Sequence, residues 1–164
     1  MSSSFAIRVN LSALELQLDA DADAVDDAAR PSAQAGAQVI YDEVKRNVAK
    51  LKRHTGNLDS SIYQVFSKSR SASGGKGLAT YHVSWNARKA PHGHLVEYGH
   101  LQRYEVTFDP ATNRFTTHRD RPLTPPKLVA AKPFLRPAVS KFDAAMDAAS
   151  AELFRRLAEK GVVS

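Results

Sequence analysis

The stretch VIYDEVKRNVAKLKRHTGNL, residues 39–58, combines the clearest helical pattern of the chain with an abrupt stop. Apolar residues in and just before it recur at steps of three and four, which is the spacing of a helix with one buried face. They are Ala33, Ala37, Ile40, Val44, Val48 and Leu51. Gly56 follows, and glycine readily adopts the left-handed conformation that closes a helix. We therefore predict a helix over residues 33–51, a turn built on Thr55 and Gly56, and a return of the chain to the core at Leu58.

Basic residues of the same stretch fall on the flank and back of the predicted helix, away from its apolar side. They are Lys45, Arg46, Lys50, Lys52 and Arg53. One interpretation is a solvated face in which Asp42 pairs with Arg46 one turn later. The other is a surface that contacts phosphates or an acidic partner. The residues alone leave both open.

Downstream of the turn, the sequence predicts antiparallel strands. Residues 61–68 and 79–86 have strand character, and Ala79, Tyr81, Val83 and Trp85 alternate with polar residues, so the second strand should have one buried face. Alternation returns at residues 104–108, and DPATN at 109–113 can turn the chain into a hairpin with residues 114–119. These segments amount to three or four strands.

Prolines mark the segment that follows. Five of the 8 prolines lie in residues 121–137, too many for a helix or a central strand, so we predict an extended arm. A helix should end the chain, with Gly161 just beyond it. Its predicted buried face consists of Val139, Phe142, Met146, Ala149, Leu153 and Leu157.

The first 30 residues differ from the rest in charge. They contain six acidic residues and two arginines, a net charge of −4. The remaining residues carry +10, which gives the whole chain its net charge of +6. Residues 5–9 have the character of a short strand and residues 11–30 that of a helix, which Pro31 kinks or separates from the next one. Opposite charges at two ends favour head-to-tail attraction between copies, although two solvated faces explain them equally well.

These elements predict an α+β fold. A long N-terminal helix and a C-terminal helix should pack on a small antiparallel sheet of three to four strands, with an extended proline-rich arm. We divide the chain into an acidic N-terminal segment, residues 1–30, and a single α+β domain, residues 31–164.

Composition is that of a soluble globular protein, with 43% hydrophobic and 24% charged residues in 164. The absence of cysteine excludes disulfides, thiolate metal sites and cysteine nucleophiles. No apolar run approaches the length of a membrane helix, and the first ten residues lack the pattern of a secretory signal. We expect a protein that is made and kept in the cytoplasm.

Motifs that imitate active sites are incomplete. DADADA at residues 19–24 starts like a calcium loop but lacks the required glycine and bidentate glutamate. GGKG at residues 74–77 lacks the first glycine and the hydroxyl residue of a phosphate loop. No serine lies in a nucleophile elbow. We expect no catalytic residues and no enzymatic activity.

One cluster contains ligand types suited to zinc or iron. Its members are His92, His94, Glu97 and His100. Their spacing matches no usual helical metal signature, so polar contacts or interface packing are the favoured interpretation. We expect no metal and no other cofactor.

Binding to nucleic acid is the alternative function that the residues favour. The basic helix face and the flexible loop at residues 67–77 could contact phosphates without reading sequence. Aromatic residues do not interleave with the basic ones, as a stacking platform for single strands requires.

Three stretches mark the predicted helix stop, central turn and arm end: HTGNLDSSI at 54–62, HGHLVEYGH at 92–100 and KPFLRPA at 132–138. In order and spacing they resemble the tail-component family of long-tailed bacteriophages and prophages, over residues 30–160. The residues that carry the resemblance are Thr55, Gly56, Leu58, Ser61, Ile62, Val96, Glu97, Tyr98, Gly99, Ala131, Pro133, Phe134, Leu135, Arg136, Pro137 and Ala138. Two features depart from the pattern: His100 replaces the usual threonine, and the acidic residues 1–30 have no counterpart.

This resemblance implies a non-enzymatic virion protein for tail completion or head-tail joining, assembled in the host cytoplasm. It implies a ring, with six copies expected, in the neck between the head connector and the tail tube. Expected partners are other copies, the tail tube or tail terminator, and the head connector. DNA in the lumen is a passive contact, and no membrane is involved. The alternative remains a sequence-nonspecific nucleic-acid-binding module.

The resemblance also directs attention to interface residues. Phe134 and Leu135, held between prolines, should anchor the arm on the protein's own core or on a neighbour. Arg136 should pair with Glu97, or with an acidic residue of the next copy. Tyr98 belongs to the same expected interface. The basic face Lys45, Arg46, Lys50, Lys52 and Arg53 would line a DNA passage or meet an acidic partner ring.

Overall fold

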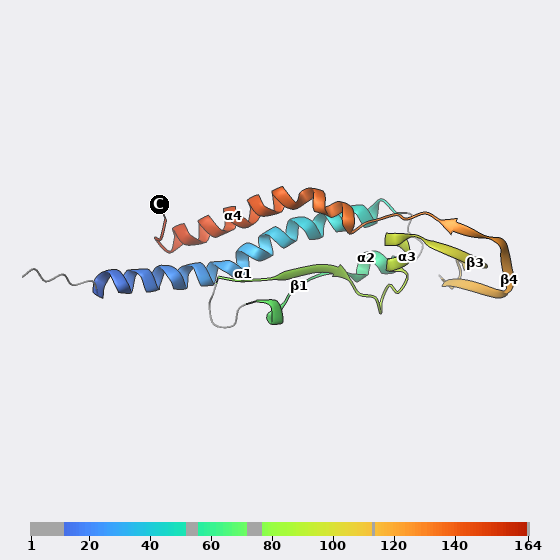
Figure 1. The fold of residues 1–164 in the computed structure, drawn as a ribbon, viewed down its shortest axis with the longest axis horizontal. Coiled ribbons are helices and arrows are strands. Elements are labelled where there is room, and N and C mark those ends of the chain that lie inside the picture. The colour runs from blue at the N-terminus through green and yellow to red at the C-terminus, as the bar shows by residue number, and fades with distance from the viewer. Residues whose placement is uncertain (1–11, 52–55, 72–76, 113, 164) are drawn as a thin grey trace, which may run out of the picture.

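The computed structural model of the protein describes residues 12–51, 56–71, 77–112 and 114–163. Its two long helices, α1 (Ser12–Ala49) and α4 (Phe142–Glu159), run antiparallel and side by side (Figure 1). Two antiparallel strand pairs complete the elongated molecule: β1 (Ile62–Phe66) with β2 (Tyr81–Trp85), and β3 (His100–Asp109) with β4 (Arg114–Val129). The short elements are α2 (Asn57–Ser61), α3 (Gly93–Tyr98), and the 3-10 turns η1 (Lys68–Arg70) and η2 (Arg136–Lys141). The predicted α+β class is confirmed.

The sequence predicted that Pro31 either kinks the first helix or separates it from a second one. Helix α1 continues through Pro31, so no second helix starts there. Proline has no backbone N–H to donate to the carbonyl four residues earlier, and the loss of this hydrogen bond typically bends a helix. Figure 1 shows a change of direction midway along α1. The first half of α1 packs on α4, because Ala24 and Ala28 are buried against Leu157. The predicted strand at residues 5–9 lies outside the described residues.

The main core lies where α1, the first strand pair, α3 and the start of η2 meet. Its buried members are Val44, Val48, Leu58, Ile62, Ala90, Phe134 and Ala138, with Val83, Trp85 and Val96 packed around them. Leu58 and Ile62 return to the core as predicted. In β2, one face was predicted to be buried and the other exposed to solvent. Both faces are half-buried instead, since every residue of that strand has intermediate exposure.

The buried face of α4 differs from the prediction. Phe142 and Met146 are 59% and 51% exposed, and Val139 just before them is 70% exposed, whereas Ala145 and Leu157 are buried. The reason is the close approach of α1: a Cβ atom on Gly36 would lie 2.8 Å from the Ala145 carbonyl oxygen. Helices this close accommodate only small residues between them at this level, so Phe142 and Met146 point outward, whereas Leu157 further along α4 is buried.

Gly36 should therefore be intolerant of a branched side chain. Gly36→Val is expected to destabilise the fold by about 1–3 kcal/mol, because the added atoms must push α4 away from α1. Urea unfolding followed by circular dichroism measures this loss. The control is Ala20→Val, a β-branched residue at an exposed position of the same helix. Equal stabilities for the two variants would contradict the close contact.

The four strands form two separate pairs, not one sheet. Strand β4 runs through Pro122, Pro125 and Pro126, so the first part of the predicted arm belongs to a strand. A two-stranded ribbon has a free edge on each strand, and a proline is tolerated where its missing N–H faces solvent. Residues 130–133 belong to no strand, although the Lys132 amide donates to the Val96 carbonyl at 2.8 Å, and a bend at Phe134 and Leu135 leads into η2.

Two glycines act at helix ends. Gly56 has φ +72°, the left-handed conformation predicted for it, but it directly precedes α2, while α1 already ends at Ala49. Gly161 has φ +74°. Its amide and that of Val162 donate to the carbonyls of Ala158 and Leu157, a Schellman closure of α4 as predicted.

Candidate functional site

Glu97 is the centre of the most organised polar site in the described chain. Helix α3 places its side chain in the interior, where it is 1% exposed. One carboxylate oxygen accepts hydrogen bonds from the amides of Phe134 at 2.7 Å and Leu135 at 3.0 Å, and the other accepts from the amide of Arg136 at 3.0 Å. Bonds to an ionised acceptor are among the stronger ones in proteins. Glu97 therefore clamps the end of the arm to α3.

Arg136 adds its side chain to the same carboxylate. Its Nε donates to Glu97 at 3.0 Å, and one terminal nitrogen donates to the Glu97 carbonyl oxygen at 2.6 Å. The guanidinium also lies over the ring of Tyr98, 5.0 Å from its centroid. Of the two partners predicted for Arg136, the one within the chain is present. Tyr98 is 66% exposed and covers the outer side of this pair.

Phe134 fastens the arm from the apolar side. Its ring is 0% exposed and meets Trp85 edge-to-face, with centroids 5.6 Å apart. Asn47 donates to the Phe134 carbonyl at 3.2 Å from the buried side of α1. The phenylalanine therefore packs on its own core, the first of the two predicted alternatives, and Leu135 packs at the margin of that core.

Asn47 was missed by the sequence reasoning. It lies between the core positions Val44 and Val48, and a polar residue on the apolar side of a helix is a usable signal for a buried hydrogen bond. Gly93 and Gly99 were also missed as packing residues. A Cβ on Gly93 would overlap the Trp85 ring, and a Cβ on Gly99 would lie 2.7 Å from the Val129 carbonyl oxygen.

The clamp should respond to acid. Burial raises the pKa of the Glu97 carboxyl, but the hydrogen bonds from Leu135, Phe134 and Arg136 outweigh it and lower the pKa below the ordinary 4.5. A lowered folded-state pKa stabilises the fold above 4.5, and that stability is lost as pH falls through the folded value. Other carboxyls also titrate in acid, among them Glu152 with a pKa of about 2. The thermal midpoints of wild type and Glu97→Gln should therefore converge below pH 4.5, and a constant difference would contradict this.

The predicted basic face is largely engaged within the chain. Lys45 forms an ion pair with Asp59 at 2.8 Å, and Arg46 forms one with Glu43 at 2.8 Å. The predicted Asp42–Arg46 pair is replaced by these contacts, because Asp42 accepts instead from Gln38. Lys50 donates to Asn47 at 3.2 Å. Lys52 and Arg53 lie outside the described residues, as does the turn residue Thr55.

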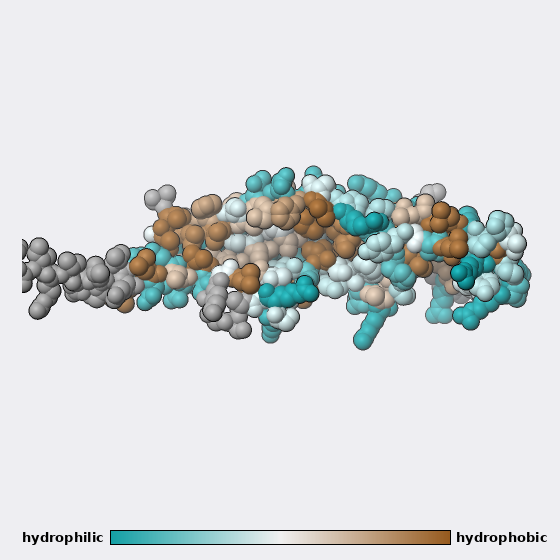
Figure 2. All heavy atoms as spheres, viewed as in Figure 1, coloured by the Kyte–Doolittle hydropathy of each residue, from teal (hydrophilic) through white to brown (hydrophobic). Residues whose placement is uncertain are grey.

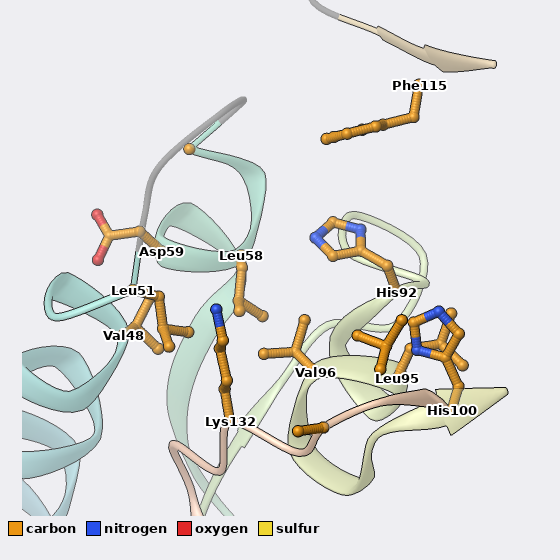
Figure 3. Close-up of a pocket in the computed structure, with 13 residues that line it drawn as sticks. Val48, Leu51, Leu58, Asp59, His92, Leu95, Val96, His100, Phe115 and Lys132 are labelled. Atoms are coloured by element: carbon orange, nitrogen blue, oxygen red, sulfur yellow. The ribbon is translucent and has the colours of Figure 1, made fainter. Parts of the chain in front are cut away.

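A cavity of about 330 Å³ opens between the end of α1, α2, α3 and the β3–β4 ribbon. Leu58, Leu95 and Val96 form its apolar wall, Lys132 extends into it, and Phe115 of β4 faces His92 across it (Figure 3). Burial, and then the charge of His94, lower the pKa of His92, so its ring is neutral at pH 7. The lining suits an apolar side chain.

The suspected metal cluster does not assemble. Glu97 faces the arm amides, and no three His, Asp or Glu side chains of the described chain are arranged to hold a metal ion.

Large apolar side chains are exposed on several elements. Figure 2 shows hydrophobic residues on the α1–α4 side and again near the ribbon. The most exposed are Leu16, Leu128 and Val139, at 72%, 76% and 70%. Exposed apolar surface that gathers in patches marks contact with other proteins.

Comparison with known families identifies the family of the chain. Residues 12–99, more than half of the chain, match the family described as "Bacteriophage HK97-gp10, putative tail-component". The chain belongs to this HK97 gp10-like family of phage tail components. Neither a curated protein nor a solved structure is similar enough to count as a match.

The match to the HK97 gp10-like family confirms the predicted tail-component resemblance. It includes the helix stop at 54–62 and the turn up to Gly99, whereas the arm end at 132–138 lies outside the matched residues. It also includes residues 12–30, to which the three sequence motifs gave no counterpart in the family. A phage tail component is part of the virion and contacts other virion proteins. None of the helices among the described residues combines the length and apolar character that a membrane span requires.

Proposed function

We propose that this tail component completes the tail and joins it to the head. In this proposal it assembles as a ring, with six copies expected, in the neck between the head connector and the tail tube. Its partners are neighbouring copies, the tail tube or tail terminator, and the head connector. It works by shape and surface complementarity and catalyses no reaction.

The observation that carries this proposal is the exposed apolar surface of the described elements. Leu16 near the start of α1, Leu128 of β4 and Val139 of η2 are 72%, 76% and 70% exposed. Stable interfaces between proteins typically bury about 1,200–2,000 Å² in total. A chain with exposed apolar residues on several elements is suited to contact several neighbours at once.

Particles made without this protein provide the test. An amber mutation in its gene should yield separate heads and tails, and a plasmid copy of the gene should restore joined, infectious particles. Electron microscopy of the lysates distinguishes the two products. Normal joining in the absence of the protein would overturn the proposed function, and a protein that stays monomeric with its tail partners present would overturn the ring.

The basic face, although largely engaged in contacts within the chain, is the place where DNA would touch such a ring. Neutralising Lys45, Arg46 and Lys50 together should weaken DNA retention or ejection if they line the lumen, with the fold kept. Titration with duplex DNA separates this role from that of a nucleic-acid-binding module, whose affinity would fall steeply with salt. Normal DNA retention and ejection in particles carrying the triple variant would rule out the lumen role.

A further inference from the structure

The β3–β4 ribbon lacks a covering layer within the described chain. Its strands pair with each other, and no other described helix or strand packs along them (Figure 1). Leu101, Val106 and Leu128 are 50%, 39% and 76% exposed. An isolated two-stranded hairpin is marginally stable in water, because neither face buries enough apolar surface. The ribbon therefore needs a partner to cover it.

Charge indicates what kind of partner this is. Arg103, Arg114, Arg119 and Lys127 on the ribbon form no ion pair with any residue that the structure describes. Arg121, in contrast, is paired with Glu105 at 3.3 Å. A ribbon that carries both unpaired cations and exposed leucine and valine fits a partner surface that is both acidic and apolar.

The first half of α1 has such a surface. Leu16, Asp19 and Asp23 are spaced three and four residues apart, so they lie on one side of the helix. Leu16 is 72% exposed, and the two aspartates form no ion pair in the described part of the chain. The next two acidic residues have partners within the chain: Asp26 accepts a hydrogen bond from the Gly77 amide, and Asp27 forms an ion pair with Lys160.

The two surfaces cannot meet within one chain. The start of α1 and the β3–β4 ribbon lie at opposite ends of the elongated molecule (Figure 1). The ribbon is long enough to accommodate the helix segment, since ten residues of β3 extend over about 33 Å, and residues 16–27 of α1 over about 18 Å.

We propose that the β3–β4 ribbon of one copy binds the α1 segment 16–27 of a neighbouring copy. Aspartates 19 and 23 face the ribbon cations, and Leu16 packs on the exposed ribbon leucines. The contact joins two different surfaces, so each added copy presents a new pair until the arrangement closes. The inference rests on the proposed assembly between copies and names the surfaces that form it.

Reciprocal charge reversal tests the contact in the full-length chain. The α1 variant is Asp19→Lys with Asp23→Lys, and the ribbon variant is Arg103→Glu with Arg119→Glu. Each alone should weaken self-association at least about tenfold in sedimentation velocity, because like charges then oppose each other. A chain with all four changes, and an equimolar mixture of the two variants, should both regain assembly.

A matched control is Lys68→Glu with Arg70→Glu, which changes the same number of exposed charges on η1, an element that belongs to neither surface. It should assemble like wild type. Wild-type chains that never associate, or an assembling wild type whose four-change variant is not rescued, would overturn the contact.

The amber-mutant particles keep this question separate from the proposed function. Reciprocal rescue together with normal joining of particles lacking the protein would sustain the contact and reject the joining role. Failed joining of particles lacking the protein, without reciprocal rescue of the charge variants, would sustain the joining role and reject the contact.

Discussion

Glu97→Ala is expected to cost about 3–5 kcal/mol of unfolding free energy. The substitution removes the acceptor of three backbone amides and of the Arg136 side chain, and it leaves the buried donors without partners. Glu97→Gln should cost less, about 1–3 kcal/mol, because its amide oxygen still accepts while its NH₂ group faces donors. Urea unfolding followed by the fluorescence of Trp85, the only tryptophan of the chain, measures both.

Glu105→Gln is the matched control. Glu105 also pairs with an arginine, Arg121, but both side chains are substantially exposed, so the loss should stay below about 1 kcal/mol. If Glu97→Ala were as mild as this control, the arm would not depend on the carboxylate. A second consequence concerns assembly, since an arm released from α3 should reduce incorporation of the protein into particles.

Phe134→Ala should have a similarly large effect, about 3–5 kcal/mol. The ring is 0% exposed and fills the space between Trp85 and α1, so its removal loses apolar burial and leaves a cavity. The fluorescence of Trp85 should change as well, because its aromatic neighbour is gone. Together the two substitutions test whether the arm is held both by polar and by apolar contacts.

Phe154→Ala provides the comparison for this loss. Phe154 on α4 is 60% exposed, so its truncation should change stability by less than about 1 kcal/mol. Similar losses for both phenylalanines would mean that Phe134 is not an anchor. The control variant also tests the outer side of α4, since Phe154 belongs to apolar surface that contacts with other proteins would cover.

The candidate site was predictable in its members but not in its geometry. Glu97, Tyr98, Phe134, Leu135 and Arg136 were singled out through the family resemblance, and Arg136 had two possible partners. The sequence could not choose between them, because 39 positions separate Glu97 from Arg136. Which carboxylate an arginine reaches depends on how the chain folds between the two residues.

The basic face shows the same limit. The helical period predicted the position of this face on α1. It did not predict which carboxylates the basic residues of the face pair with. Lys45 pairs with Asp59 of α2, and that contact exists only because the chain reverses direction around Gly56. Arg46 pairs with Glu43 because the predicted partner Asp42 is held by Gln38.

The sequence by itself determined what depends on neighbours along the chain. The helical period before Leu51, the left-handed glycines at 56 and 161, and the places of the strands follow from local geometry, and so does the α+β class. Tertiary structure alone decided which side of α4 is buried, since Gly36 brings α1 against Ala145. It also decided that the strands form two pairs and that Glu97 clamps the arm. These features depend on contacts between distant segments, whose free energies no local pattern encodes.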